Sequence, residues 1–394
     1  MKTAIFTICS RNYLAYALTL QKSLQAHEPG RPFFIYLADA PLDPGTEPDA
    51  TIIPVQDLKL PDMLDMAFRY TVMEFNTAIK ADCFLDLLTK RGFDAAIYLD
   101  PDIQVFAPLA EVHGALSSGA SVVLTPHLLE PLPPDAYPSE LDILKSGVFN
   151  LGFGAFSCTQ ESLAFIRWWA EKLHKQCYSA PEQGLFVDQR FVDMAPAFIE
   201  RFFVLRNPGY NVAYWNMATR NVSKTDSGVT VNGAPLIFFH FSGVVAGKPA
   251  VFSKHLGGRQ SNATEPALVL VSDYLDQLKA QDHDRWSNIP YAFDRFRDGS
   301  FIIPPMRRLP PTYGSAEDWF AAPDVKFWTA PDPRIDQNWA MKITRLMMEI
   351  WQARPDLQAA FPLSKSSGRR ALYVWFRRHG VKEYGKIVAR KSAL

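Results

Sequence analysis

The first 126 residues alternate between short apolar runs and longer segments whose apolar residues recur with helical spacing. The runs of strand length are residues 3–9, 32–39, 51–55, 95–99 and 120–126, and the helical segments are 14–26 and 68–92. Alternating strands and helices fold into a mostly parallel sheet that is covered by helices. The alternation therefore predicts an α/β fold with a doubly wound, Rossmann-like sheet, in which Gly92 ends the second helix.

The pattern continues beyond residue 126. We expect a glycine-rich strand at 147–157, a helix at 159–177 with Thr159 as its N-cap, and a buried strand within 234–243 that runs up to His240. The Pro-rich segment 127–142 has the composition of a lid or a connector. Beyond residue 283 the pattern becomes helical and irregular, with many prolines. We therefore predict a first domain over residues 1–283 and a helical, Pro-rich and basic region over 284–394.

Composition excludes several classes of protein. The chain has 41 basic and 41 acidic residues, so a general nucleic-acid-binding surface is not expected. The cysteines, at positions 9, 83, 158 and 177, form no CxxC pair, which suits a reducing compartment and argues against a structural zinc. Arg11 interrupts the apolar start, which favours a strand and a helix over a signal peptide, and no apolar run is long enough to span a membrane. We expect a cytoplasmic protein.

Two acids follow the apolar run at 95–99 directly, in the sequence "IYLDPDIQVF". Asp100 and Asp102 stand at a strand end, and His240 ends a second apolar run about 140 residues later. Ligands of α/β sheets bind beyond the carboxyl ends of the strands. Two carboxylates and one imidazole suit Mn²⁺, and carboxylates alone suit Mg²⁺; such an ion can hold a diphosphate and stabilise it as a leaving group. The alternatives are a surface turn for the acids and a hydrogen-bonded core histidine for His240.

Five motifs in order resemble a known family. "IYLDPDIQVF", "FNLGFGAF", "FVDQRFVD", "GYNVAYWN" and "FFHFSG" are similar to the GT-A glycosyltransferases, in particular to the retaining, family 8-like group of glycogenin and the bacterial lipooligosaccharide galactosyltransferases. The resemblance covers about residues 1–260. It implies a GT-A fold, a nucleotide-sugar donor that is most often UDP-linked, and Mn²⁺ held by Asp100, Asp102 and His240, with Asp100 also touching the ribose.

The resemblance extends to further positions. Asp188 and Gln189 match an acid–amide pair near the reacting sugar carbon, although Asp188 could instead cap a helix. Asn150 matches a residue that contacts the donor sugar, with an ordinary turn or bulge as the alternative. Lys80 stands where relatives carry an arginine that reaches the donor; the alternative is a solvated lysine.

Other matching positions concern the nucleotide. Thr7, Ser10 and Asn12 lie at the end of the first strand, where relatives hold the base and the ribose; helix capping by Ser10 or Asn12 is the alternative. Relatives carry a glycine three residues after the histidine and a phosphate-binding lysine three residues further on. Gly243 is kept here, but the candidate lysines are Lys248 and Lys254, so a cation on the diphosphate is expected from one of them.

The segment "GYNVAYWN" offers flat aromatic faces and amides for a donor or acceptor pocket. Its candidates are Asn211, Trp215 and Asn216. Tryptophan and tyrosine rings stack on sugars while keeping a polar group available. Ordinary aromatic packing in the core is the alternative.

These observations predict a metal-dependent retaining glycosyltransferase that moves a sugar from a nucleotide donor, with UDP as the expected nucleotide, to a glycan or a lipid-linked saccharide in polysaccharide biosynthesis. Transfer could proceed by front-face displacement, which we prefer, or through a covalent intermediate on Asp188. One alternative is a phosphatase of the haloacid dehalogenase type, with Asp100 as nucleophile, Asp102 as acid–base and a late acidic motif in "LVLVSDYLD" at 268–276. The other is a non-catalytic GT-A-like binding protein.

The last 27 residues form a basic segment with interleaved aromatic residues. This segment contains one acid, Glu383, and eight basic residues. The basic residues are Arg369, Arg370, Arg377, Arg378, Lys382, Lys386, Arg390 and Lys391. A basic amphipathic helix can lie on an anionic membrane surface. Two interpretations stay open for this segment: a solvated helix that packs its aromatic residues on its own domain, and peripheral contact with the inner face of the membrane.

Overall fold

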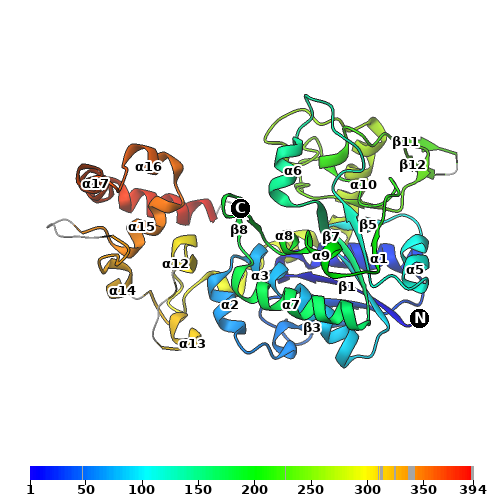
Figure 1. Cartoon of the computed structure of the whole chain (residues 1–394), viewed down its shortest axis with the longest axis horizontal. Helices are drawn as coiled ribbons and strands as arrows, with labels where there is room; N and C mark the ends of the chain where they lie inside the picture. The colour runs from blue at the N-terminus through cyan, green and yellow to red at the C-terminus, as the bar shows by residue number, and fades with distance from the viewer. Residues whose placement is uncertain are drawn as a thin grey trace. The chain divides into compact units, whose positions relative to one another are not determined.

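The computed structural model describes the chain except residues 47, 227, 309, 311–313, 324, 336–341 and 392–394, and it describes 305, 325, 326 and 380–391 as backbone only. The chain divides into two compact units. The main unit comprises Met1–Pro61 and Met73–Tyr291, and the second unit comprises Asp62–Val72 and Ala292–Leu394 (Figure 1).

A seven-stranded mixed sheet forms the centre of the main unit. Its strand order is β10-β6-β7-β4-β1-β2-β3, with β1 at Thr3–Cys9, β2 at Phe33–Leu37, β3 at Ile52–Pro54, β4 at Ala95–Leu99, β6 at Val122–Pro126, β7 at Phe149–Ser157 and β10 at Phe202–Val204. Strands β3, β2, β1 and β4 run parallel, as do β6 and β10, whereas β7 is antiparallel to both β4 and β6. The α/β fold class is confirmed, with a mixed sheet.

Helices cover both faces of this sheet because successive side chains of a buried strand point to opposite faces. Ile5 of β1 belongs to a cluster with residues of α1 (Leu14–His27) and α5 (Ala110–Ser117). Its neighbour Phe6 instead packs edge-on against Phe84 of α4 (Lys80–Leu85), which in turn contacts Trp169 of α7 (Gln160–Gln176). The predicted N-cap of α7 is confirmed: the hydroxyl of Thr159 accepts a hydrogen bond from the backbone N–H of Ser162.

The single helix predicted over residues 68–92 is wrong. The chain forms α2 (Met63–Arg69), α3 (Val72–Ala78), α4 and a π-helical turn at Asp86–Lys90, and Gly92 follows with a positive φ of 67°. The first break falls at Tyr70, whose backbone is extended. Within the second unit, the buried guanidinium of Arg307 donates to the carbonyls of Ala67, Phe68 and Tyr70 at 2.8–3.1 Å. A long-range contact therefore competes with the helical hydrogen bonds that the local pattern predicted.

Short strands and helices complete the main unit. The predicted strand within 234–243 is divided: β13 (Ala234–Pro235) joins β11 (Val222–Thr225) and β12 (Gly228–Val231), whereas β14 (Phe238–His240) pairs with β5 (Ile103–Val105). The segment 127–142 leads into α6 (Glu140–Ser146), which begins with a capping box of Ser139 and Asp142. The remaining elements are β8 (Ser179–Ala180), β9 (Leu185–Phe186), α8 (Gln189–Val192), α9 (Ala195–Phe198), α10 (Glu265–Ala280) and α11 (His283–Ser287).

The second unit is mainly helical in its described part, as predicted for the C-terminal region. Besides α2 it contains α12 (Pro304–Arg308), α13 (Ala316–Trp319), α14 (Val325–Thr329), α15 (Arg345–Gln352), α16 (Pro355–Ala360) and α17 (Ser366–Lys391). Leu372 and Phe376 of α17 are buried in its core, and Tyr373 and Trp375 pack against it. These aromatic residues therefore pack on their own unit, which is the alternative weighed above for the basic segment.

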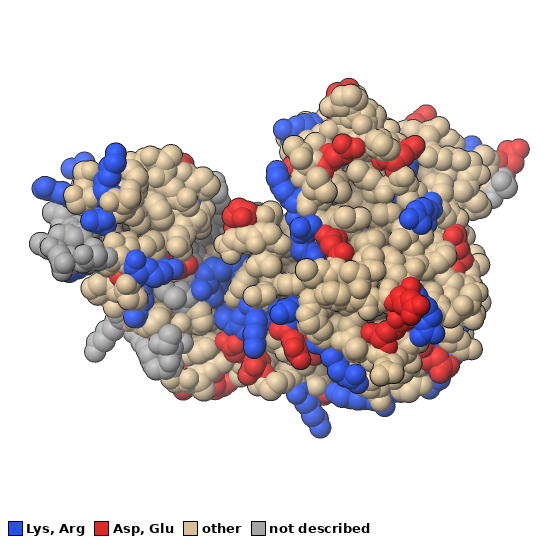
Figure 2. Space-filling model, in the orientation of Figure 1, with Lys and Arg blue, Asp and Glu red and all other residues tan. Residues whose placement is uncertain are grey.

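The charges of α17 remain available on its surface where they are described. Arg370, Arg377 and Arg378 are exposed. The other predicted contacts at Lys382, Lys386, Arg390 and Lys391 lie outside the described side chains. On the face of the main unit shown in Figure 2, basic and acidic side chains are interspersed. Among the residues described, no helix is both long and apolar enough to cross a bilayer.

Candidate metal and donor site

Strand pairing explains why the two acids and the distant histidine meet. Asp100 and Asp102 occupy the tight turn between β4 and β5, which is closed by a hydrogen bond from the Ile103 N–H to the Asp100 carbonyl at 3.1 Å. Strand β14 pairs antiparallel with β5, so His240 stands opposite Ile103. The backbone N–H of Phe241 then donates to the carbonyl of Asp102 at 2.8 Å. His240 is thus held beside the acidic turn by main-chain hydrogen bonds.

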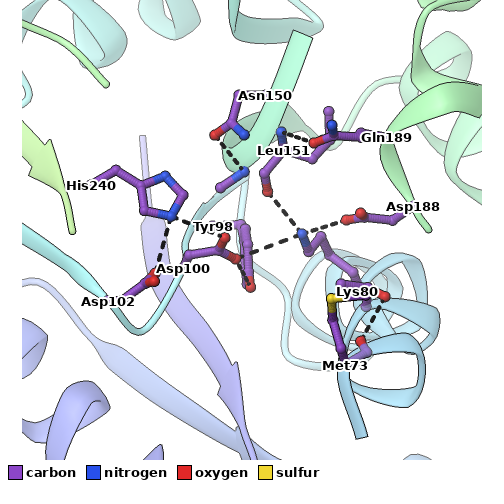
Figure 3. Close-up of polar contacts among 12 residues, drawn as sticks. Met73, Lys80, Tyr98, Asp100, Asp102, Asn150, Leu151, Asp188, Gln189 and His240 are labelled. Atoms are coloured by element: carbon purple, nitrogen blue, oxygen red, sulfur yellow. Dashed lines mark hydrogen bonds and ion pairs between the residues drawn. The ribbon is translucent and has the colours of Figure 1, made fainter. Parts of the chain in front are cut away.

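The three side chains converge on one point (Figure 3). His240 Nε2 lies 3.1 Å from Asp102 Oδ1 and 3.6 Å from Asp100 Oδ2. One ligand atom from each residue lies within 4.8 Å of the other two. The His240 side chain is 4% exposed, whereas Asp100 and Asp102 are 29% and 18% exposed. Two oxygen donors open to solvent and one nitrogen fixed from behind fit a divalent cation such as Mn²⁺.

The pKa shifts of His240 and Asp102 indicate that the cluster favours positive charge. Burial alone would lower the pKa of His240, but the negative charges of Asp102 and Asp100 outweigh it and raise that pKa. Burial alone would raise the pKa of Asp102, and the neighbouring imidazole lowers it instead. The cluster therefore attracts positive charge, either as a proton on the imidazole or as a metal ion.

Strand β7 forms one wall of the site because it begins where antiparallel β4 ends. The backbone N–H of Asp100 donates to the carbonyl of Gly152 at 2.7 Å. A Cβ atom at Gly152 would lie 2.4 Å from His240 Cε1 and 2.8 Å from Asn150 Oδ1. Only glycine leaves room there for the imidazole ring. The close approach expected from the glycine-rich segment is therefore an approach by His240.

A buried ion pair lies next to the acidic turn. Lys80 Nζ pairs with Asp188 Oδ2, lies 3.9 Å from Asp100 Oδ1 and donates to the Leu151 carbonyl at 2.8 Å. The same ammonium group stands 4.0 Å from the ring centroid of Tyr98, and the Tyr98 hydroxyl donates to Asp100 Oδ1 at 2.5 Å. Lys80 is 1% exposed, so it is not the solvated lysine that was the alternative.

Asp188 and Gln189 occupy the start of α8 but have different partners. The Asp188 side chain makes no helix-capping hydrogen bond, and its carboxylate faces Lys80. Burial raises the pKa of Asp188, and the Lys80 charge opposes this rise. Gln189 accepts from the Leu151 N–H at 3.2 Å and donates to the Ser146 carbonyl at 2.8 Å. Gln189 thereby connects β7 to the end of α6.

Two of the three residues predicted to bind the nucleotide at the end of β1 are more deeply buried than Asp100 and Asp102. Thr7 is fully buried, and its hydroxyl has no hydrogen-bond partner among the described residues. Ser10 is 1% exposed and donates to Asn12 Oδ1 at 2.5 Å, with no capping hydrogen bond to the following turn. Asn12 is half-buried and is the one of the three with appreciable exposure.

The segment after His240 brings an additional histidine to the site. Gly243 has a φ of 77°, and a Cβ atom there would lie 2.5 Å from His255 Cδ2. The imidazole of His255 stacks on Tyr214 with 5.4 Å between ring centroids. Burial and the charge of Lys254 lower the pKa of His255. His255 was not among the residues predicted from the sequence, although it follows Lys254 directly.

The two candidate lysines of this segment are both exposed. The backbone N–H of Lys254 donates to the Gly243 carbonyl at 2.8 Å, so its main chain is tied to the glycine. Lys248 closes a turn with Val245 through its own N–H at 3.1 Å. The main chain of Lys254 is therefore hydrogen-bonded to Gly243, whereas that of Lys248 belongs to a separate turn.

The motif "GYNVAYWN" contributes buried packing and polar contacts. Trp215 is 5% exposed and meets the His240 ring edge-on, with 5.2 Å between centroids. Asn216 is fully buried and donates to the Asn211 carbonyl at 3.0 Å. Asn211, also fully buried, lies 3.3 Å from His240 Nδ1. These residues pack behind His240 rather than lining an open surface.

The segment that the phosphatase alternative needs is helical. Residues 268–276 lie within α10, which runs from Glu265 to Ala280. A late acidic motif at the end of a strand is therefore absent from that described segment.

The fold and the site together define an α/β protein with an Asp-Asp-His cluster beyond the carboxyl end of the central strand β4. No family model matches the chain. Two Bacillus subtilis (strain 168) proteins are similar in sequence and are themselves described as uncharacterized. YfnF is 26% identical over 259 residues, 62% of this chain and 82% of YfnF; YfnD is 27% identical over 269 residues, 67% of this chain and 81% of YfnD.

Three solved structures resemble the chain more distantly. The galactosyltransferase LgtC, in complex with donor and acceptor sugar analogs, is 16% identical with a TM-score of 0.41, and the match covers 73% of this chain and 97% of LgtC. The bifunctional glycosyltransferase WbbM is 14% identical with a TM-score of 0.41, and the match covers 74% of this chain and 50% of WbbM. A glycosyltransferase involved in glycosylation of the major capsid of PBCV-1 is 9% identical with a TM-score of 0.35, and the match covers 70% of this chain and 99% of that protein.

Proposed function

We propose that this protein is a metal-dependent glycosyltransferase that uses a nucleotide-sugar donor. The observation that carries the proposal is the convergence of Asp100, Asp102 and His240 beside the buried Lys80–Asp188 pair. Four of these five residues, all but Lys80, lie in the sequence motifs that resemble the retaining GT-A transferases. Their spatial convergence supports the same reading independently of the sequence resemblance.

Asp100, Asp102 and His240 would hold the metal ion, for which Mn²⁺ fits the mixed oxygen and nitrogen donor set. When bound, such an ion neutralises the charge of a diphosphate leaving group. Lys254 and His255 lie beside Gly243; the exposed ammonium of Lys254 would add positive charge to the same diphosphate, and the imidazole of His255 would offer it a hydrogen bond. Asn12 is the most accessible of the predicted contacts for the ribose or the base.

The chain's own residues favour front-face transfer with retention over a covalent intermediate. A nucleophilic Asp188 would have to approach the sugar carbon, but its carboxylate is 3% exposed and paired with Lys80. Loss of this pairing would leave a buried ammonium without its partner, which is costly. In front-face transfer the acceptor oxygen bonds to the anomeric carbon, the bond to the diphosphate breaks, and the acceptor proton passes to a phosphate oxygen. Asp188 and Gln189 then position groups around the sugar.

The acceptor in this proposal is a glycan or a lipid-linked saccharide, and the donor is UDP-linked. The exposed arginines Arg370, Arg377 and Arg378 on α17 would attract the protein to an anionic membrane surface at the cytoplasmic face. This membrane association is a separate proposal, because the residues that carry it belong to the second unit.

A panel of UDP-, GDP- and CMP-sugars tests the function. Calorimetry should detect nucleotide binding that strengthens when Mn²⁺ is added, and mass spectrometry of reaction mixtures should detect sugar transferred to an acceptor or, more slowly, to water. Asp102→Asn should abolish metal-dependent turnover with an unchanged circular dichroism spectrum. Full turnover in that variant would refute the metal assignment.

The same preparation tests the two alternatives. Hydrolysis of a simple phosphate ester with Mg²⁺, without turnover of any sugar nucleotide, would favour a phosphatase with Asp100 as nucleophile. Tight Mn²⁺-dependent nucleotide binding without turnover of any donor would favour a binding protein. Helical residues 268–276 give the phosphatase no late strand-end acid in that segment.

A further inference from the structure

A buried chain of amides lies behind His240, on the side away from the acids. Asn150, Asn211 and His127 are 8%, 0% and 4% exposed, and none of them contacts Asp100 or Asp102 through a hydrogen bond that the structure records. Buried polar groups must pair donor with acceptor, so the orientation of each amide depends on its neighbours. One group, a backbone N–H, can only donate a hydrogen bond, and it therefore fixes the orientation of every amide in this hydrogen-bonded series.

Gly152 supplies that group. Its N–H donates to a side-chain atom of Asn150 at 3.1 Å. A backbone N–H can only donate, so this atom of Asn150 must be the acceptor Oδ1. The amide atom of Asn211 that lies 3.0 Å from the same oxygen must then be the donor Nδ2. It also lies 2.9 Å from Thr125 Oγ1, which can accept.

The other end of the Asn211 amide is therefore its oxygen, and it faces His240. Asn211 Oδ1 lies 3.3 Å from His240 Nδ1. Because a carbonyl oxygen only accepts, Nδ1 must carry a proton. In the neutral ring this leaves the Nε2 lone pair pointing at Asp100 and Asp102, from which it is 3.6 and 3.1 Å away. A lone pair beside two carboxylates favours a positive charge at this place, either a second proton on the ring or a metal ion.

The contact between Asn150 and His127 extends the same hydrogen-bonded series in the other direction. Asn150 Nδ2 lies 3.3 Å from His127 Nε2, which must accept, so His127 is neutral with its proton on Nδ1, a buried atom that has no hydrogen-bond partner among the described residues. Burial lowers the pKa of His127 to about 4, which agrees with a neutral ring. The backbone of Asn211 has a φ of 53°, a left-handed conformation that asparagine and glycine tolerate better than other residues.

We infer that the Gly152 N–H, acting through Asn150 and Asn211, fixes His240 in the tautomer whose Nε2 is free to bind a divalent cation. The metal-binding part of this inference rests on the proposed function; the tautomer itself does not. Asn211 is then a positioning residue. Outer-shell partners of this kind orient metal-binding histidines, and their loss typically weakens metal affinity about 10–100-fold.

The first test reads the tautomer directly in the full chain without metal. Long-range proton–nitrogen correlation spectra, recorded at a pH where the His240 ring is neutral, should show the proton on Nδ1. In Asn211→Gly it should move to Nε2, where the carboxylate of Asp102 can accept it. Wild-type protein with the proton on Nε2, or a variant with an unchanged tautomer, would overturn the inference even if the protein transfers sugar.

The second test measures Mn²⁺ binding by calorimetry. Asn211→Gly should weaken binding about 10–100-fold, and Asn211→Asp, which restores an acceptor oxygen, should bind more tightly than Asn211→Gly. The matched control is Asn232→Gly, because Asn232 also has a left-handed backbone (φ 50°) and hydrogen-bonded amide but is exposed on a hairpin. Equal weakness in both Asn211 variants would reduce that residue to a packing role.

These outcomes separate the inference from the proposed function. The expected tautomer in a protein that does not bind Mn²⁺ would support the amide chain and refute metal-dependent transfer. Tight Mn²⁺ binding with the opposite tautomer would refute the amide chain and leave metal-dependent transfer standing.

Discussion

Lys80 and Asp188 form an ion pair in which both side chains are almost completely buried, at 2% and 3% exposure. Lys80 also lies 3.9 Å from Asp100, so one ammonium group stands between the acidic turn and the start of α8. Burying one charge without its partner costs far more than burying a matched pair. The pair therefore ties the integrity of the site to the stability of the main unit.

Lys80→Met should destabilise the protein by about 3–5 kcal/mol, since it leaves Asp188 buried without a cation. Chemical denaturation followed by fluorescence measures the change in the free energy of unfolding. The double variant Lys80→Met/Asp188→Leu should recover much of that loss while remaining inactive, because both buried charges are removed. A single variant as stable as the wild type would contradict the buried pairing.

Gly152→Ala should abolish Mn²⁺ binding, because the added methyl group would overlap the His240 ring and Asn150 Oδ1. The matched control is Gly154→Ala, two residues along the same buried strand, where the nearest atom is Leu124 Cδ2 at 3.3 Å. Calorimetry on both variants should separate them, with near-normal binding in the control. Equal binding in the two variants would show that His240 does not need the space at Gly152.

Glu28→Gln should lower the free energy of unfolding by about 2 kcal/mol at neutral pH, because hydrogen bonds to a charged group are lost or weakened. The Glu28 carboxylate accepts from the Leu109 N–H at 2.7 Å, from Arg31 at 3.2 Å and lies 2.9 Å from His113 Nε2. Burial opposes these contacts, but together they lower the pKa of Glu28.

The pH dependence of this effect follows from the sign of the shift. A carboxyl group whose pKa is lowered by folding contributes stability above its unfolded pKa, and that contribution is lost as the pH falls through the folded value. The difference in stability between wild type and Glu28→Gln should therefore shrink below about pH 4. A difference that grew on acidification would contradict the assigned contacts. Urea denaturation at several pH values provides the measurement.

Replacement of Arg370, Arg377 and Arg378 by glutamine should weaken binding to vesicles that contain anionic phospholipid. At about 1 kcal/mol for each basic residue near the surface, the loss is roughly a hundredfold or more. Vesicle sedimentation at low salt measures it. Replacement of the exposed Lys22, Lys224 and Lys279 of the main unit makes the same change in net charge and is the control. Equal losses in both triple variants would indicate general charge attraction rather than docking through α17.

Much of the central sheet could be predicted because its strands are short, apolar and fully buried. Residues 3–9 and 95–99 form strands with the predicted bounds, and the Thr159 N-cap is present. The helix over 68–92 could not be predicted, because Arg307, more than 200 residues away, holds the carbonyls that end α2. Local periodicity contains no information about such a partner.

The Asp100, Asp102 and His240 cluster could be predicted from the sequence because the two acids follow one apolar strand-like run and the histidine ends another. The amide chain behind His240 was not, since Asn150 and Asn211 become neighbours only through the pairing of β7 and the approach of residue 212 to β14. His255 was missed for a similar reason: its relation to the site depends on the turn at Gly243. An imidazole beside a lysine has no spacing rule that would indicate such a role.

The most direct test of the central claim is anomalous diffraction at the manganese edge from crystals grown with Mn²⁺ and UDP. The account predicts one strong peak bounded by Asp100, Asp102 and His240 Nε2, with the diphosphate on its open side. A peak elsewhere, or no peak at this site at saturating Mn²⁺, would contradict it.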